Sequence, residues 1–111
     1  MTVEVGEDHD LEPDAILRCG DPLPADATAI PDPLVVVEIP LLSTARSDLH
    51  RKLVDYFRLP TVQHYLVFAP DRPEVIHYRR SDIGPVHGVH TTGPLRLDPP
   101  GLTITLQDVY A

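Results

Sequence analysis

Apolar residues fall in short runs along this chain, and the clearest run predicts a buried strand. Residues 34–39 read Leu-Val-Val-Val-Glu-Ile, a nearly continuous β-branched stretch. Such a run is typical of a strand covered on both faces of a sheet, because both sets of side chains must then be apolar. Pro40 follows directly and predicts the end of the strand, since proline lacks the amide that a ladder needs.

The next segment has helical periodicity. Residues 45–58 place apolar side chains at i, i+4, i+5 and i+8, which fall on one stripe of a helix. The stripe consists of Leu49, Leu53, Val54 and Phe57. We expect Ser43, Thr44 or Ser47 to cap the start of this helix, and Pro60 to end it.

Shorter segments predict the rest of a sheet. Residues 64–68 form another apolar strand, and the order strand, helix, strand predicts a parallel βαβ unit. Residues 74–79 alternate in polarity and should pair antiparallel with that strand. Further strands are expected at residues 2–5, 15–19, 88–91 and 102–106. The predicted fold class is therefore α/β, with a mixed β-sheet, a βαβ unit and few helices.

One helix cannot cover both faces of a sheet whose strand at residues 34–39 is so apolar. We therefore expect additional cover, either from a segment that this chain lacks or from a partner subunit. A C₂ homodimer is the commonest arrangement that would supply it.

Length and charge narrow the function. The chain fits one domain, which we take to span residues 1–111. Seventeen acidic residues against nine basic ones give a formal net charge of −8. This charge disfavours passive binding to nucleic acid, because phosphates attract positive surfaces. A bound divalent cation would offset part of the repulsion locally.

The cellular location is suggested by features that the sequence lacks. Cys19 is the only cysteine, so no internal disulfide can form, which suits a reducing cytoplasm. Residues 1–10 show neither the basic region nor the apolar run of a signal peptide, and the apolar run at 34–37 is too short to span a membrane. We expect a cytoplasmic protein without membrane contact.

Two acidic residues on predicted strands are candidates for a metal site. Asp14 opens the strand at residues 15–19, and Glu38 lies near the end of the apolar strand. A carboxylate is costly to bury alone, so Glu38 either reaches solvent at the end of the sheet or faces a cation. Two carboxylates from neighbouring strands, with one backbone carbonyl, form the hard oxygen site that suits Mg²⁺.

Lys52 adds a basic group near these acids. The predicted crossover folds its helix back across the sheet, so an inward-leaning Lys52 could approach the carboxylates. Its alternative partner is Asp48, one turn earlier at i, i+4. Such a surface pair stabilises a helix by only ~0.2–0.5 kcal/mol. The spacing alone favours the surface pair.

Other polar groups have simpler structural explanations. His87 and His90 share an i, i+3 spacing, but a zinc site needs more ligands in a tighter pattern, so we expect a solvent-facing turn there. Ser43, Asp48 and His50 lie around one helix start, where capping explains them better than a catalytic triad.

Five short motifs follow one another along the chain. They are Pro13-Asp14, Val37-Glu38-Ile39, Ser43-Thr44, the set Asp48, Lys52 and Tyr56, and the pair Val62 and Tyr65. From about residue 10 onward this order resembles the Uma-type putative restriction endonuclease family, which belongs to the PD-(D/E)XK nuclease superfamily. The chain departs from that family at Pro40, just after the strand. It departs again at His64, a position at which the family has a glutamate. It is also expected to be a shortened copy, because only twelve residues precede Pro13.

The resemblance implies a restriction-endonuclease-like fold and a site for DNA cleavage. Asp14 and Glu38 would be ligands of Mg²⁺ or Mn²⁺, and Lys52 would be the catalytic lysine, moved from the strand to the helix. With a net charge of −8 we expect at most weak metal-dependent cleavage of DNA. The alternative is a non-catalytic interaction module of the same fold, which dimerises or pairs with a full-length homologue.

Overall fold

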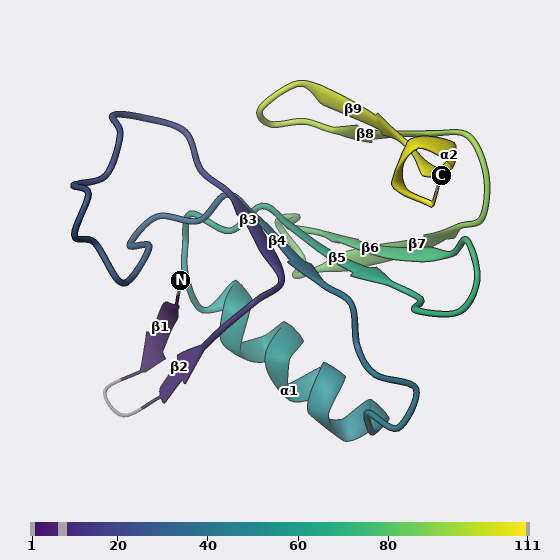
Figure 1. The fold of residues 1–111 in the computed structure, drawn as a ribbon, viewed down its shortest axis with the longest axis horizontal. Coiled ribbons are helices and arrows are strands. Elements are labelled where there is room, and N and C mark those ends of the chain that lie inside the picture. Colours follow the sequence, from purple (N-terminus) through teal and green to yellow (C-terminus); the bar gives the residue numbers. More distant parts are fainter. Residues whose placement is uncertain (1, 7–8, 111) are drawn as a thin grey trace.

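A five-stranded sheet lies at the centre of the protein, and the computed structural model describes residues 2–6 and 9–110 (Figure 1). The central sheet consists of β3 (Ala15–Leu17), β4 (Val35–Glu38), β5 (His64–Phe68), β6 (Val75–Arg79) and β7 (Val86–His90), in that spatial order. The other elements are β1 (Val3–Gly6), β2 (His9–Leu11), α1 (Arg46–Phe57), β8 (Pro94–Leu97), β9 (Leu102–Thr105) and α2 (Leu106–Val109). None of the helices in the described ranges is long and apolar enough to cross a membrane.

The strand pairing confirms the predicted mixed α/β sheet. Strand β4 pairs in parallel with β5, and α1 connects them, so the predicted βαβ unit is present. Strand β3 pairs antiparallel with β4, and β6 pairs antiparallel with both β5 and β7. The strand expected at residues 88–91 is β7, which forms one edge of the sheet, so the solvent-facing turn expected at His87 and His90 is wrong.

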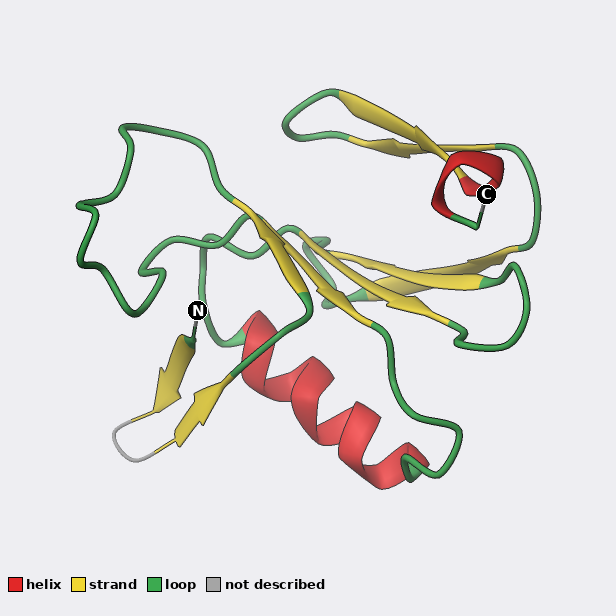
Figure 2. Ribbon diagram, viewed as in Figure 1, coloured by secondary structure: helices red, strands yellow, loops and turns green. Residues whose placement is uncertain are grey.

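Both faces of the centre of the sheet are covered, as Figure 2 shows. Helix α1 and the β1–β2 pair pack on one face, whereas the β8–β9 pair and α2 pack on the other. Val35 and Val36, neighbours on β4, are 3% and 0% exposed, and each buried valine contributes roughly 1.5–3 kcal/mol. The expectation that a missing segment or a partner must cover β4 is therefore wrong. Two short strand pairs provide the cover that the helix count did not reveal.

Helix α1 begins without the side-chain cap that the sequence suggested. Its N-cap is Ala45, and no side chain caps it by a hydrogen bond, so Ser43, Thr44 and Ser47 do not have the expected role. The chain enters the helix through a turn closed by the backbone bond from Thr44 N to Leu41 O, at 2.9 Å. Because the first turn of the helix is exposed, water can satisfy its free amides.

The strand register aligns side chains in rows across the α1 face of the sheet. One row is Glu38, Val67, Ile76 and Val89. The next row is Val36, Tyr65, Tyr78 and His87. Partners in register share a face of the sheet. An apolar row therefore runs from Glu38 on β4 to the open edge strand β7, and an aromatic row lies beside it.

Candidate active site

Glu38 is a buried carboxylate with two partners from one helix. It is the last residue of β4, it faces α1, and it is 5% exposed. The Tyr56 hydroxyl donates a hydrogen bond to Glu38 Oε1 at 2.7 Å, and Lys52 Nζ donates to Oε2 at 3.4 Å. Burial rules out the alternative in which Glu38 reaches solvent, and the helix supplies the cation instead.

Lys52 and Tyr56 reach the same carboxylate because residues four apart lie on one face of a helix. The alternative ion pair with Asp48 does not form, since Asp48 lies 4.0 Å from Arg51 instead. The Lys52 side chain keeps 34% of its surface exposed and borders a hollow of about 280 Å³. Its ammonium therefore joins the buried carboxylate to solvent.

Asp14 lies at the same end of the β3–β4 pair. Its amide donates to Val37 O at 3.0 Å, and its carboxylate Oδ2 accepts from Ile39 N at 2.6 Å. In the antiparallel register Ala15 pairs with Val37, so the position of Asp14, one residue earlier, lies opposite that of Glu38. The structure thus brings Asp14, Glu38 and Lys52 to one end of the sheet.

Two tyrosines beside Glu38 remain protonated donors. Burial, followed by the hydrogen bond and charge of Glu38, raises the pKa of Tyr56 far above its ordinary value. Burial and the charge of Glu38 also raise the pKa of Tyr65, whose ring centre lies 5.2 Å from that of Tyr56. The buried Tyr65 hydroxyl has no hydrogen-bond partner among the described residues. Such a group costs about 1–3 kcal/mol unless a water or ligand oxygen satisfies it.

The donor set fits a sparsely ligated hard cation. Within residues 2–6 and 9–110 no group of three or more His, Cys, Asp or Glu side chains is arranged to hold a metal ion. Two carboxylates, Asp14 and Glu38, suit Mg²⁺, which commonly keeps several waters and takes one or two carboxylates. A closed zinc cage, by contrast, would need four protein ligands.

A second buried polar cluster lies on the opposite face of the sheet. His64 Nδ1 lies 2.7 Å from His77 Nε2, and His64 Nε2 lies 2.8 Å from the carbonyl of Pro99. A carbonyl only accepts, so Nε2 of His64 carries the proton, and Nδ1 accepts from Nε2–H of His77. Every ring nitrogen named here has a partner, and the pair ties the β8–β9 turn to the sheet.

Sequence reasoning named two residues of the site only as members of motifs. Tyr56 and Tyr65 had no assigned role, although the spacing of Tyr56 from Lys52 already places both on one helical face. The lack of a partner for Tyr65 depends on tertiary packing and has no sequence signal. The His64–His77 pair joins separate strands and was likewise missed.

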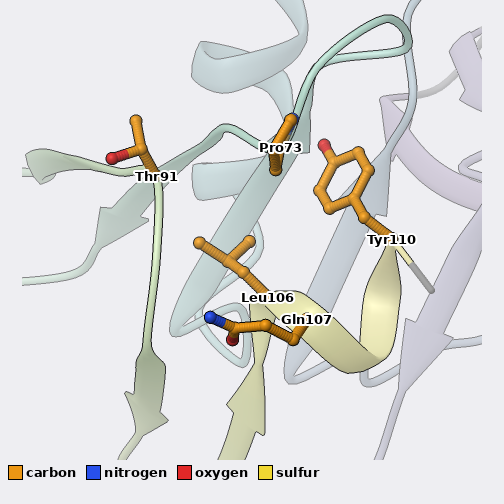
Figure 3. A pocket seen from close by; sticks show the side chains of 5 residues that line it. All are labelled: Pro73, Thr91, Leu106, Gln107 and Tyr110. Atoms are coloured by element: carbon orange, nitrogen blue, oxygen red, sulfur yellow. The ribbon is translucent and has the colours of Figure 1, made fainter.

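The C-terminal helix lines a different hollow, shown in Figure 3. Its volume is about 310 Å³, and its lining residues are Pro73, Thr91, Leu106, Gln107 and Tyr110. None of these lining residues is Asp, Glu, His, Lys or Arg. The Tyr110 hydroxyl donates to the carbonyls of Ala69 and Glu74 at 2.8 and 3.0 Å, which anchors the helix to the β5–β6 turn. The lining thus offers hydroxyl and amide groups but no carboxylate.

The mixed sheet and the βαβ unit make this chain a restriction-endonuclease-like α/β domain. The sequence matches the Uma2 family, described as "Putative restriction endonuclease", over residues 1–107, and the chain belongs to that family. A crystal structure described as a putative nuclease belonging to DUF820, from Anabaena variabilis, superposes with a TM-score of 0.58 at 16% identity. The match covers 76% of this chain and 48% of the other, so this chain spans about half of that length. No curated protein matches.

Proposed function

We propose that this chain is a Mg²⁺- or Mn²⁺-dependent endonuclease domain that hydrolyses phosphodiester bonds in DNA. Membership of the family described as "Putative restriction endonuclease" supports nuclease chemistry. The observation that carries the proposal is the buried Glu38 carboxylate, held between the Tyr56 hydroxyl and the Lys52 ammonium at the end of β4. A buried acid with a solvent-linked cation beside it is an arrangement suited to catalysis.

Each residue of the site has a distinct role in this proposal. Asp14 and Glu38 would hold the metal ion, which lowers the pKa of a bound water and stabilises charge on the scissile phosphate. Lys52 would orient the attacking water and add positive charge near the phosphate. Tyr56 is a positioning residue, because its hydroxyl fixes Oε1 of Glu38 while Oε2 lies on the side of Lys52.

We propose that cleavage by this chain alone is weak. The net charge of −8 gives little attraction for a polyanion, so DNA capture should be poor and sensitive to salt.

We also propose a cytoplasmic location, because the free, exposed Cys19 is compatible with a reducing compartment.

The test is incubation of the purified chain with plasmid and single-stranded DNA at low salt, with Mg²⁺, with Mn²⁺ or with EDTA. We expect metal-dependent cleavage that disappears in Glu38→Gln and falls about 100-fold or more in Lys52→Ala. Arg51→Ala is the matched control, because it removes a neighbouring exposed cation that does not reach Glu38. Cleavage that survives in Glu38→Gln would assign the activity to another site or a contaminant.

Exposed apolar residues after β4 favour a second candidate, a non-catalytic interaction module. Leu41 and Leu42 are each 75% exposed, and Ile39 is 50% exposed. Such a patch suits a homodimer or a pairing with a full-length homologue. Light scattering at micromolar concentration separates the candidates. The homodimer of an interaction module has a mass above that of the 12.3 kDa monomer. Leu42→Asp should return such a dimer to the monomer mass.

A further inference from the structure

A hollow of about 400 Å³ lies beside the carboxylate site, between α1 and the β6–β7 half of the sheet. Its wall comes from the first turns of α1, which contribute Arg46, Leu49 and His50. Leu49 also borders a second hollow, which opens beside Val67, the register partner of Glu38. The two hollows share Leu49 and Ile76 in their linings, and the second lies nearer to the acidic end of β4.

The floor of this hollow comes from both rows, with Ile76 and Val89 from the apolar row and Tyr78 and His87 from the aromatic row. Tyr65 and Tyr78 stack with ring centres 5.8 Å apart and planes inclined by 23°. Tyr78 is followed by His87, at 5.6 Å and 40°, on the open edge strand β7. Tyr65 is buried beside the catalytic carboxylate, whereas His87 is exposed, so the row links the site to an accessible flat ring.

The lining is also distinct in charge. None of the described residues that line this hollow is acidic, although the whole chain carries 17 acids and a net charge of −8. Arg46 contributes a positive charge, and the imidazoles of His50 and His87 contribute hydrogen-bonding groups. A nucleic acid would bring a phosphate of opposite charge to Arg46 and a flat base to the aromatic rings of Tyr78 and His87.

We infer that this hollow binds an unpaired base of single-stranded nucleic acid, stacked against Tyr78 and His87, with its phosphate beside Arg46. Aromatic rings that accept bases, next to a cation that accepts phosphate, are the features that bind single strands. The inference rests on the proposed function, which it narrows to unpaired or locally opened DNA. A strand bound here would pass from the edge of β7 toward Glu38 along the apolar row.

The test measures binding without cleavage, by fluorescence anisotropy in EDTA at low salt. The probes are a labelled single strand of roughly 12 nucleotides, the same strand with central abasic sites, and its duplex. We expect the abasic strand to bind wild type about fivefold more weakly or worse, because stacking is lost while the phosphates remain. The duplex should also bind more weakly than the single strand, since its bases are paired.

Variants locate the base in the hollow. His87→Ala and Arg46→Ala should each weaken single-strand binding, and in His87→Ala the penalty for abasic sites should shrink, which shows coupling between ring and base. Arg96→Ala is the matched control, because it removes an exposed arginine from β8, on the other side of the sheet. Tyr78→Leu keeps apolar volume at the floor and should lose the base preference. Thermal unfolding checks that each variant is folded.

Three outcomes would overturn the inference. Equal binding of normal and abasic strands, or equal effects of Arg46→Ala and Arg96→Ala, would mean that no base occupies the hollow. A dimer that Val89→Asp disperses would assign the hollow to a second copy. Failure of the proposed function is separate, because Glu38→Gln should abolish cleavage while it leaves the base preference intact. A chain that prefers normal to abasic strands but cleaves none would retain the inference and lose the nuclease.

Discussion

The two faces of the central sheet each bury a polar cluster, and the clusters differ in completeness. On the β8–β9 face, His64 and His77 satisfy one another and the Pro99 carbonyl at 2.7 and 2.8 Å. On the α1 face, the Lys52 contact to Glu38 is long, at 3.4 Å, and the Tyr65 hydroxyl has no partner among the described residues. The contacts of the first cluster are all paired, which makes it closed, whereas the second keeps an unsatisfied hydroxyl.

This difference separates structure from function. A buried polar group with all its hydrogen bonds fixes a unique packing and gains nothing from a ligand. A group that is buried yet unsatisfied lowers stability until a water, metal or substrate completes it. Both clusters are rich in titratable groups, so composition alone would not have distinguished them.

The histidine cluster should respond most strongly to acid. Burial lowers the pKa of His64, and burial with the neighbouring His64, His90 and Arg79 lowers that of His77 to about 4. Below the ordinary histidine pKa of about 6.5, the unfolded chain therefore binds more protons than the folded chain. We expect stability to be complete above that pH and to fall by roughly 2–3 kcal/mol as the pH drops toward 4.

Urea unfolding at pH 7, 5.5 and 4.5 checks this, with His77→Gln as the variant. An amide cannot take up the proton, so the variant should lose less stability between these pH values than wild type. Identical pH dependence in both proteins would contradict the description of a closed, neutral pair.

Tyr56→Phe should affect both stability and activity. It removes the hydroxyl that donates to Glu38 and leaves a buried carboxylate oxygen short of a partner, which costs about 1–3 kcal/mol. Cleavage should fall about 10–100-fold, as is typical when a group that orients a metal ligand is removed. Metal titration of the cleavage rate provides a further readout, because a purely structural tyrosine would leave the metal affinity unchanged. An unchanged metal affinity would exclude the positioning role.

Tyr65→Phe should give the smallest effect on stability, and its sign is informative. Removing an unsatisfied buried hydroxyl should stabilise the metal-free protein by up to about 1 kcal/mol, while cleavage decreases. Thermal unfolding in EDTA, beside the cleavage assay, measures both. Marked destabilisation would show that the hydroxyl has a structural partner, and that the α1 face is as closed as the other.

The sequence predicted the elements with strong periodicity and missed those that depend on packing. The apolar run of β4, the stripe of α1 and the alternation of β6 were sufficient to predict the βαβ unit and the antiparallel pair. The short segment Pro94–Leu97 carries little pattern, and β8 was not separately predicted. The cover of the sheet was therefore predicted wrongly, because the sequence of a short strand pair does not indicate which face of the central sheet it covers.

The residues of the candidate site divide in the same way, into those that sequence motifs indicated and those that only packing brings together. The ordered motifs led to Asp14, Glu38 and Lys52, which the fold brings to one end of the sheet. Their metal-binding and catalytic roles remain proposals. The tyrosine contacts and the His64–His77 pair join residues that are distant in sequence, and such contacts exist only after the strands are placed in register.

Isothermal titration with Mn²⁺ tests the central claim most directly, because it compares the two clusters without DNA. We expect one ion per chain for wild type, for His77→Gln and for the surface control Arg96→Ala, and none for Glu38→Gln. Circular dichroism confirms that each variant is folded before titration. Binding that persists in Glu38→Gln, or that disappears in His77→Gln, would contradict the assignment of the metal to the carboxylate cluster on the α1 face.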